Sequence, residues 1–234
     1  MYKYPIDING KKFSIQPYNT EKEKDMLIMS SFEIYDINEI LRVLGLSDEI
    51  INELTHKEKK VVLFKFREIS VGEELNIKFK CTNCQQQQDG FFSISGTITK
   101  SGDLTYKQLD KEVTDENLHE FVDISEEEIL NLELNEYENL LQEVKDSQVK
   151  YNFTRVCKCI KCKQENYFSI YDDKYIIESL SEDTLMSLYK TYNDMCMFGK
   201  YTKRDVDSLY PFERTILIGL INKTREEIKQ GVGK

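Results

Sequence analysis

The sequence predicts an α+β protein in which helical N- and C-terminal parts flank an inserted antiparallel β module, stapled by a zinc-ribbon-like four-cysteine site. Three observations predict this fold class. Apolar residues recur at helical spacing near both ends, polar and apolar residues alternate in the middle, and two Cys-x-x-Cys pairs lie among the alternating segments. We divide the chain into an N-terminal hairpin and helices (1–72), a β module with zinc knuckles and an inserted helical region (73–172), and a C-terminal helical region (173–234).

The N-terminal part begins with a predicted hairpin over 2–16, because a polar turn separates two short alternating segments. Residues 20–54 carry charges on one side and apolar side chains on the other, which predicts helices. Thr55 and Glu58 form a capping-box pattern that opens a further helix. We expect that helix to end near Ser70.

The β module is predicted from segments in which apolar residues occupy every second position. Residues 73–81 alternate in this way and lead into the first cysteine pair, and residues 91–99 are the predicted partner strand. A helical region over 125–147 follows, opened by a second capping-box pattern. Predicted strands over 151–157 and 165–172 enclose the second cysteine pair.

The C-terminal region is predicted to be helical. Ser181 is the expected N-cap of a helix that continues to about Phe198, and a short helix is expected over 203–209. Pro211 fits the first position of the last helix, because its fixed φ angle suits a helix start and its missing N–H is not needed there.

Composition and charge exclude several classes of protein. The formal net charge is −10 and basic residues are mixed with acidic ones, so we do not expect a protein that coats nucleic acid. No apolar run approaches the roughly 18 residues needed to span a bilayer. The start, MYKYPIDING, lacks the apolar core of a signal peptide. We therefore expect a reducing compartment, where clustered cysteines indicate metal more often than disulfides.

Each of the two cysteine pairs, Cys81 with Cys84 and Cys159 with Cys162, lies on a polar turn between two strand-like segments. Two thiolates three positions apart on a tight turn can face one ion, and two such turns make a tetrahedral four-sulfur zinc site. A closed site of this kind leaves no position for water or substrate. The predicted zinc is therefore structural, not catalytic.

Cys157 is the alternative ligand, because it lies two positions before Cys159 on the same strand face. Two other interpretations of the cysteines stay open. They would be free thiols in a β region, or a redox pair, although no thioredoxin-like βαβ setting is recognisable around them.

Other patterns do not predict an enzyme or a small-molecule substrate. None of the ten glycines lies in a phosphate-binding pattern, and the two histidines offer little for a catalytic metal or a Ser-His-Asp arrangement. Aromatic residues gather in the last helices, either as core or as a protein-binding surface. Arg214 is expected to pair with Glu213 or with the preceding helix. The candidate interaction residues are Tyr192, Tyr210, Pro211, Phe212, Glu213 and Arg214.

Residues 185–227, with the motif Leu-Tyr-Pro-Phe-Glu-Arg before the last helix, resemble the C-terminal region of the baseplate hub assembly family of T-even type contractile-tailed bacteriophages. The middle of the chain is similar too. There a helix is followed by Arg67, Ser70, Gly72 and Glu73, and then by a strand and Cys-x-x-Cys. The order of parts agrees over most of the chain, while Cys157 and the polar region 100–150 depart from it.

The resemblance implies a structural or assembly protein of the tail baseplate, in the hub region, and not an enzyme. Its partners would be other phage tail and baseplate proteins, in the virion or in the host cytoplasm during assembly. The alternative is a zinc-ribbon regulator that binds a polymerase or nucleic acid. It would use a small basic group around the zinc site, formed by Lys78, Lys80, Lys158, Lys161 and Lys163.

Overall fold

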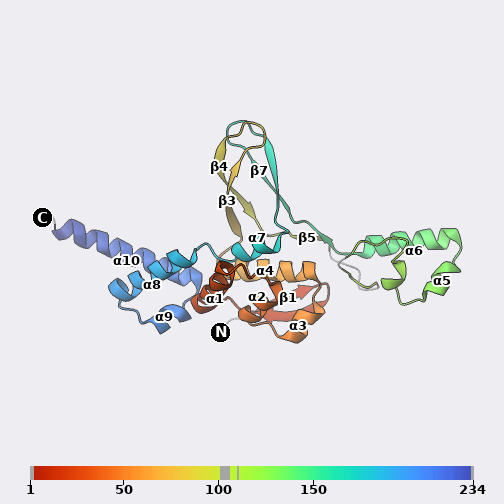
Figure 1. Cartoon of the computed structure of the whole chain (residues 1–234), viewed down its shortest axis with the longest axis horizontal. Helices are drawn as coiled ribbons and strands as arrows, with labels where there is room; N and C mark the ends of the chain where they lie inside the picture. Colours follow the sequence, from red (N-terminus) through yellow and green to blue (C-terminus); the bar gives the residue numbers. More distant parts are fainter. Residues whose placement is uncertain (1–2, 101–105, 110, 233–234) are drawn as a thin grey trace.

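The computed structural model describes residues 3–100, 106–109 and 111–232. A helical body carries three projections: a β arm, a small helical module and a C-terminal group of helices (Figure 1). The α+β class predicted from the sequence is confirmed, with helices and small antiparallel sheets. In the described part of the chain, no helix combines the length and the apolar character that crossing a membrane requires.

The body consists of a hairpin and five helices. β1 and β2 pair in antiparallel register, and Thr55 forms the predicted capping box with Glu58 at the start of α4. Gly45 ends α2 with φ 99°, a conformation that costs a residue with a side chain more than glycine. The elements are β1 (Tyr4–Ile8), β2 (Lys11–Ile15), α1 (Thr20–Ser31), α2 (Ile37–Leu44), α3 (Asp48–Glu53), α4 (His56–Ser70) and α7 (Asp173–Glu178).

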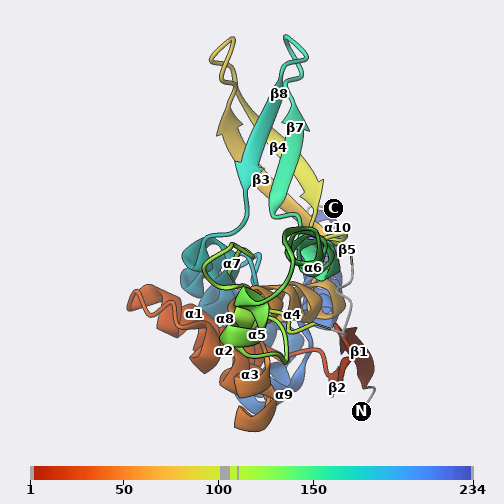
Figure 2. The same cartoon turned by 90° about the vertical axis from the view of Figure 1, so that its right-hand side faces the viewer.

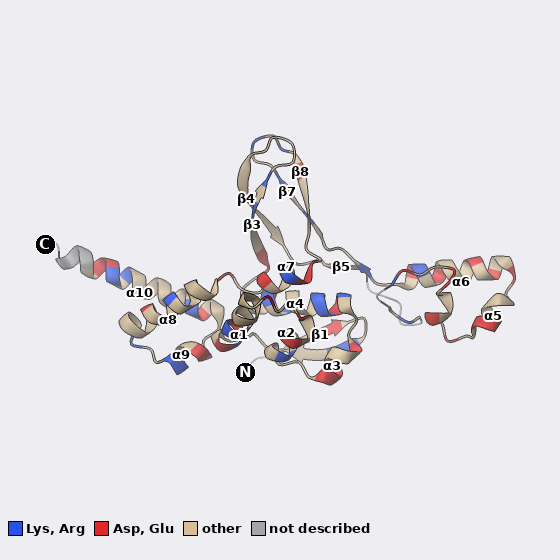
Figure 3. Ribbon diagram, in the orientation of Figure 1, with Lys and Arg blue, Asp and Glu red and all other residues tan. Residues whose placement is uncertain are grey.

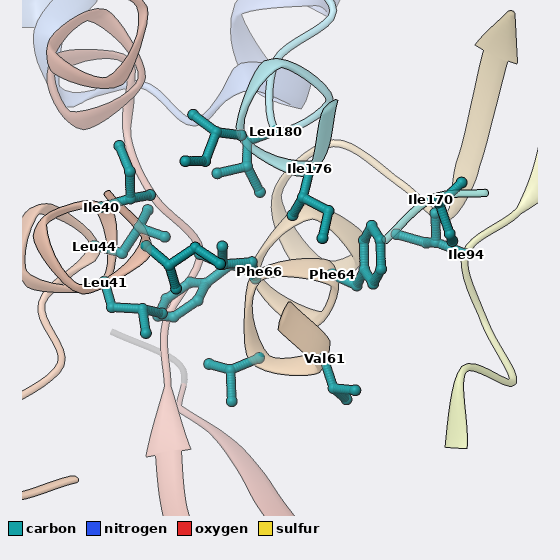
Figure 4. Packing of buried hydrophobic residues seen from close by; sticks show 14 of the residues in the cluster. Ile40, Leu41, Leu44, Val61, Phe64, Phe66, Ile94, Ile170, Ile176 and Leu180 are labelled. Carbon is teal, nitrogen blue, oxygen red and sulfur yellow. The ribbon is translucent and has the colours of Figure 1, made fainter. Parts of the chain in front are cut away.

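Helix α4 lies at the centre of the largest hydrophobic core. Its Phe66 packs toward Leu41 and Leu44 of α2, while its Phe64 points toward Ile170 at the base of the arm (Figure 4). Helix α7 covers another side of α4 through Ile176, so segments from both halves of the chain share one core. This core fixes the position at which the arm leaves the body.

The arm consists of two antiparallel hairpins whose far ends carry the cysteine turns (Figures 1 and 2). The rings of Phe79 and Phe168 meet edge to face at 5.1 Å between the hairpins. Near the base, the buried Arg155 donates to Ser93 O at 2.7 Å and to Thr97 Oγ1 at 3.0 Å. The strands are β3 (Glu74–Lys80), β4 (Gln87–Ser93), β7 (Thr154–Lys158) and β8 (Glu165–Ser169).

The predicted partner strand over 91–99 is displaced in the structure, where β4 spans Gln87–Ser93. The cysteine turn is itself the hairpin turn, because the Cys81 N–H donates to Gln86 O at 2.9 Å. Pairing therefore begins directly after Gln86, so that the polar residues Gln87 and Gln88 belong to the strand. The alternating residues beyond Ser93 instead reach β5 (Ile98–Lys100), which pairs with β6 (Lys150–Tyr151).

A small helical module projects from the body beyond β5 and β6 (Figures 1 and 2). It contains η1 (Leu118–Glu120), α5 (Glu126–Leu130) and α6 (Leu134–Ser147). The module has its own hydrophobic cluster, in which Phe121 and Val144 are fully buried. Ser125 and Glu128 cap α5 as predicted.

The C-terminal region contains α8 (Leu185–Gly199), α9 (Lys203–Ser208) and α10 (Pro211–Val232), and Pro211 opens the last helix as predicted. The predicted N-cap at Ser181 is wrong, because Thr184 caps α8. The Ser181 hydroxyl instead donates to Glu23 Oε1 at 2.6 Å. The hydrophobic clusters do not follow the three-part division of the chain, since Ile176 beyond its second boundary lies in the body core. That division stays a prediction.

Candidate metal centre

The structure brings four of the six cysteines together at the end of the arm. The Sγ atoms of Cys81 and Cys162 lie 3.6 Å apart, and those of Cys84 and Cys159 also lie 3.6 Å apart. All four sulfur atoms lie within 4.8 Å of one another. Each hairpin therefore contributes one cysteine pair to a single cluster of four thiols.

The two cysteine turns are built in the same way. Cys81 N–H donates to Gln86 O at 2.9 Å and Gln85 N–H donates to Cys81 O at 3.0 Å. In the second turn, the Cys159 N–H donates to Gln164 O at 2.8 Å and the Lys163 N–H to Cys159 O at 2.9 Å. Because the same two backbone hydrogen bonds form in each turn, both turns curl around their cysteines in the same way. The result is two knuckles that face one point.

The residue after each second cysteine has a left-handed backbone. Gln85 has φ 59° and Lys163 has φ 62°. Zinc knuckles usually place glycine at this position, and the sequence has none there. The structure shows that the turn keeps its conformation with ordinary side chains, at the steric cost that the left-handed region imposes on them.

Backbone N–H groups inside the knuckles favour thiolates. The N–H of Cys84, helped by smaller hydrogen-bond contributions, lowers the pKa of the Cys81 thiol to about 6, although burial acts in the opposite direction. The N–H of Cys162 likewise lowers the pKa of Cys159. The Gln86 N–H acts in the same direction on Cys84, but burial and the hydrogen bonds with the other three cysteines raise the pKa of Cys84 to about 11. Four thiols this close favour a cation among them, because thiolates without one repel each other.

The donor set fits a structural zinc ion. Four sulfur ligands from two Cys-x-x-Cys turns are the usual tetrahedral zinc ligands, and Cys81 and Cys159 are fully buried. With four protein ligands, such a site has no free position for a reacting molecule. A metal ion bound by these four cysteines would therefore serve to join the two hairpin tips.

Two amide side chains that the sequence analysis missed connect the knuckles. Asn166 Oδ1 accepts from the Thr82 N–H at 2.9 Å, and its Nδ2 lies 3.8 Å from Cys81 Sγ. Gln88 occupies the equivalent place in the other hairpin and accepts from the Ile160 N–H at 3.0 Å. Both amides lie four residues after the second cysteine of their own knuckle, a spacing that could have revealed them.

Cys157 lies apart from the four clustered thiols. Its Sγ donates to Phe91 O at 3.5 Å inside the arm, and burial raises its pKa. A Cβ on Gly90 would come within 3.2 Å of this sulfur and within 2.8 Å of the Phe79 ring. The structure thus places Cys159, and not Cys157, beside the other three cysteines.

Three of the six candidate interaction residues are buried: Tyr192, Pro211 and Arg214. Arg214 is 3% exposed, and it pairs with Glu23 of α1 and, at 2.7 Å, with Asp183. The sequence analysis expected Glu213 or the preceding helix as the partner, but the two carboxylates that pair with Arg214 lie in α1 and before α8. Glu213 instead accepts from the Tyr210 N–H at 3.0 Å at the start of α10.

Tyr192 is also buried, and its hydroxyl donates to Asp207. Tyr210 and Phe212 stack with ring centroids 5.7 Å apart, and Phe212 is 47% exposed while Pro211 is buried. The motif around Pro211 therefore mainly attaches the C-terminal helices to the body, and Phe212 is its most exposed aromatic side chain.

Comparison with known proteins gives one match. A family model described as T4 bacteriophage base plate protein matches residues 1–99. The matched segment contains the hairpin and helices α1 to α4 of the body and the first knuckle of the arm, and it ends before the second knuckle. No curated protein and no solved structure gives a significant match. The match supports a baseplate protein with a structural role.

Proposed function

We propose that this chain is a structural or assembly protein of a contractile phage tail baseplate, in the hub region, and that it acts through contacts with other tail proteins. The observation that carries the proposal is the family match over residues 1–99. A structural family also favours a protein that is not an enzyme. The resemblance of residues 185–227 to hub assembly proteins is the reason for placing it in the hub.

We further propose that Cys81, Cys84, Cys159 and Cys162 bind one structural Zn²⁺ ion. Binding free energies of such sites are on the order of 10–16 kcal/mol, enough to hold two hairpins that share few apolar side chains. The ion would keep the arm rigid, so that its surface has a defined shape for a partner.

The baseplate role is tested by locating the protein. Particles purified from an infected culture are digested, and peptides of this chain are quantified beside known tail proteins. Amounts comparable to those of other tail proteins would support a built-in component. Absence from particles, together with co-purification of hub proteins from the lysate, would identify an assembly factor. Absence from both would refute the baseplate role.

The zinc site is tested by native mass spectrometry of the purified chain. We expect one zinc per chain, lost in Cys84→Ser and Cys162→Ser. Cys157→Ser and Cys196→Ser are matched controls, because their sulfur atoms lie outside the cluster of four, and both variants should keep the metal. A folded wild-type protein without metal would end the proposal.

The second candidate function is a zinc-ribbon regulator that binds a polymerase or nucleic acid. It is favoured by five exposed lysines on the outer half of the arm: Lys78, Lys80, Lys158, Lys161 and Lys163. Nucleic-acid binding by these side chains would weaken steeply as salt is raised. No detectable binding of DNA or RNA at about 50 mM salt, where such contacts are strongest, would argue against nucleic acid as the partner.

A further inference from the structure

Charge is divided unevenly along this chain. Residues 101–149 hold 15 of its 42 acidic and 3 of its 32 basic residues, a formal charge of −12, whereas the remainder has 27 acidic and 29 basic residues. The excess negative charge of the protein therefore belongs to the projecting helical module, where red dominates in Figure 3. Asp123 pairs with Lys107, and Glu120 with Lys111, but three cations cannot balance this many carboxylates.

The same module exposes large apolar side chains at the junction of α5 and α6. Leu130 is 77% exposed and Leu134 is 71% exposed. Leu130 borders a cleft of about 340 Å³ that also has acidic side chains on its rim. We call this surface the module patch: Ile124, Glu126, Glu127, Leu130, Leu134 and Glu138.

The arm has the opposite charge and its own exposed apolar side chains. Val156 and Tyr167 are cross-strand neighbours on the outer face of the β7–β8 hairpin, and Tyr167 is 66% exposed. Ile160, in the knuckle, is 71% exposed. We call this surface the arm patch: Val156, Lys158, Ile160, Lys161, Lys163 and Tyr167.

The two patches match in kind, since each combines charges that are mainly of one sign with large exposed apolar side chains, and the prevailing signs are opposite. The arm patch also borders one carboxylate, Glu165, which pairs with Lys158 at 3.4 Å. Exposed apolar side chains among charges are typical of protein interfaces, and complementary charge selects the partner and its orientation. A bound zinc would give the four-thiolate centre a formal charge of about −2, but its sulfur atoms face inward while the lysines project outward. The ammonium groups that the arm patch presents to a partner are therefore mainly those of the exposed Lys161 and Lys163.

Within one molecule the arm and the module leave the body in different directions, so the two patches do not lie against each other (Figures 1 and 2). We propose that the arm patch of one copy docks on the module patch of a second copy, so that the chain self-associates head to tail. A contact between two different surfaces repeats from copy to copy, and it closes into a ring or continues as a chain. The inference rests on the proposed structural role and names a second copy as one partner.

The experiment is analytical ultracentrifugation of the zinc-loaded full chain at about 100 µM, a concentration at which a micromolar contact is nearly saturated. At about 50 mM NaCl we expect species above the monomer mass of 27.6 kDa. At about 500 mM NaCl the Debye length falls to a few ångströms, and we expect mainly monomer. A monomer at low salt overturns the proposal.

Charge exchange tests the docking surfaces themselves. Lys161→Glu/Lys163→Glu and Glu126→Lys/Glu127→Lys should each weaken self-association by about tenfold or more, and the combination of all four should restore it. Leu130→Ser should weaken it without any change of charge. Arg204→Glu/Lys223→Glu is the matched control, because it reverses two exposed cations on α9 and α10 and should leave association unchanged.

Zinc content and circular dichroism of every variant separate a lost contact from a lost fold. The proposal is overturned if the control variant weakens self-association. It is also overturned if the variant that combines all four substitutions does not restore self-association. A protein found in particles but monomeric at low salt refutes this inference and leaves the baseplate role. A self-associating protein that is absent from particles and from hub complexes refutes the baseplate role alone.

Discussion

The ion pair between Arg214 and Glu23 allows a quantitative test of how the C-terminal helices are attached. The Arg214 guanidinium lies between Glu23 of α1 and Asp183, and it also donates to Thr20 Oγ1 at 3.0 Å. Burial alone would lower the pKa of Arg214, but the hydrogen bond and the charge of Glu23 raise it. The guanidinium of Arg214 therefore stays charged. Its removal should destabilise the protein mainly by leaving the Glu23 carboxylate without its cationic partner.

In Arg214→Met, the Glu23 carboxylate would stay 1% exposed with the Ser181 hydroxyl as a remaining donor. Asp183, with its side chain 29% exposed, would lose less because water reaches it. Removing one partner of a buried ion pair costs about 3–5 kcal/mol of unfolding free energy. This is a large part of the roughly 5–15 kcal/mol that holds a typical domain together.

The assay is urea unfolding followed by circular dichroism, comparing the free energy of unfolding of each variant with that of the parent. Lys65→Met is the matched control, because it removes a lysine whose ion pair with Glu68 is partly exposed, and it should cost less than about 1 kcal/mol. Glu23→Gln/Arg214→Met should recover part of the loss, since it leaves no unpaired buried charge. Equal and small losses in Arg214→Met and Lys65→Met would refute the reasoning.

Three further predictions concern the arm. Gly90→Ala should lower the free energy of unfolding by about 1–3 kcal/mol in urea unfolding, because the new Cβ would collide with Phe79 and Cys157. An unchanged value would show that these neighbours make room for the Cβ without loss of stability. Lys163→Gly should raise the melting temperature by relieving a left-handed residue. The left-handed region costs a residue with a side chain about 1–2 kcal/mol, of which the chain entropy of glycine offsets about 0.5–1 kcal/mol. Lys161→Gly, outside that conformation, should not raise it, and equal effects would count against this explanation. Asn166→Ala should weaken zinc binding about 10–100-fold in chelator competition, because Asn166 holds the first knuckle and contacts Cys81, and retention at parental affinity would exclude that role.

Much of the local structure follows from the sequence alone. The capping boxes at Thr55 and Ser125 and the proline that opens α10 appear where local patterns predict them, because each depends on hydrogen bonds or dihedral angles within a few residues. The pairing of four cysteines into one cluster also follows from two matching strand–knuckle–strand segments. Such features need no knowledge of the rest of the chain.

Tertiary structure alone decided the contacts between distant segments. Spacing suggested a neighbour for Arg214, but the folded chain brings the start of α10 to α1, where the buried Glu23 pairs with it. The choice between Cys157 and Cys159 depended on how the two hairpins face each other, which no property of either residue reveals. Likewise, the excess of acidic residues over 101–149 is visible in the sequence, but only the fold shows that the helical module with α5 and α6 projects apart from the arm. Local sequence patterns determine helices, strands and turns because the interactions that stabilise these elements lie within a few residues. Which distant side chains pair with each other depends instead on how the whole chain packs.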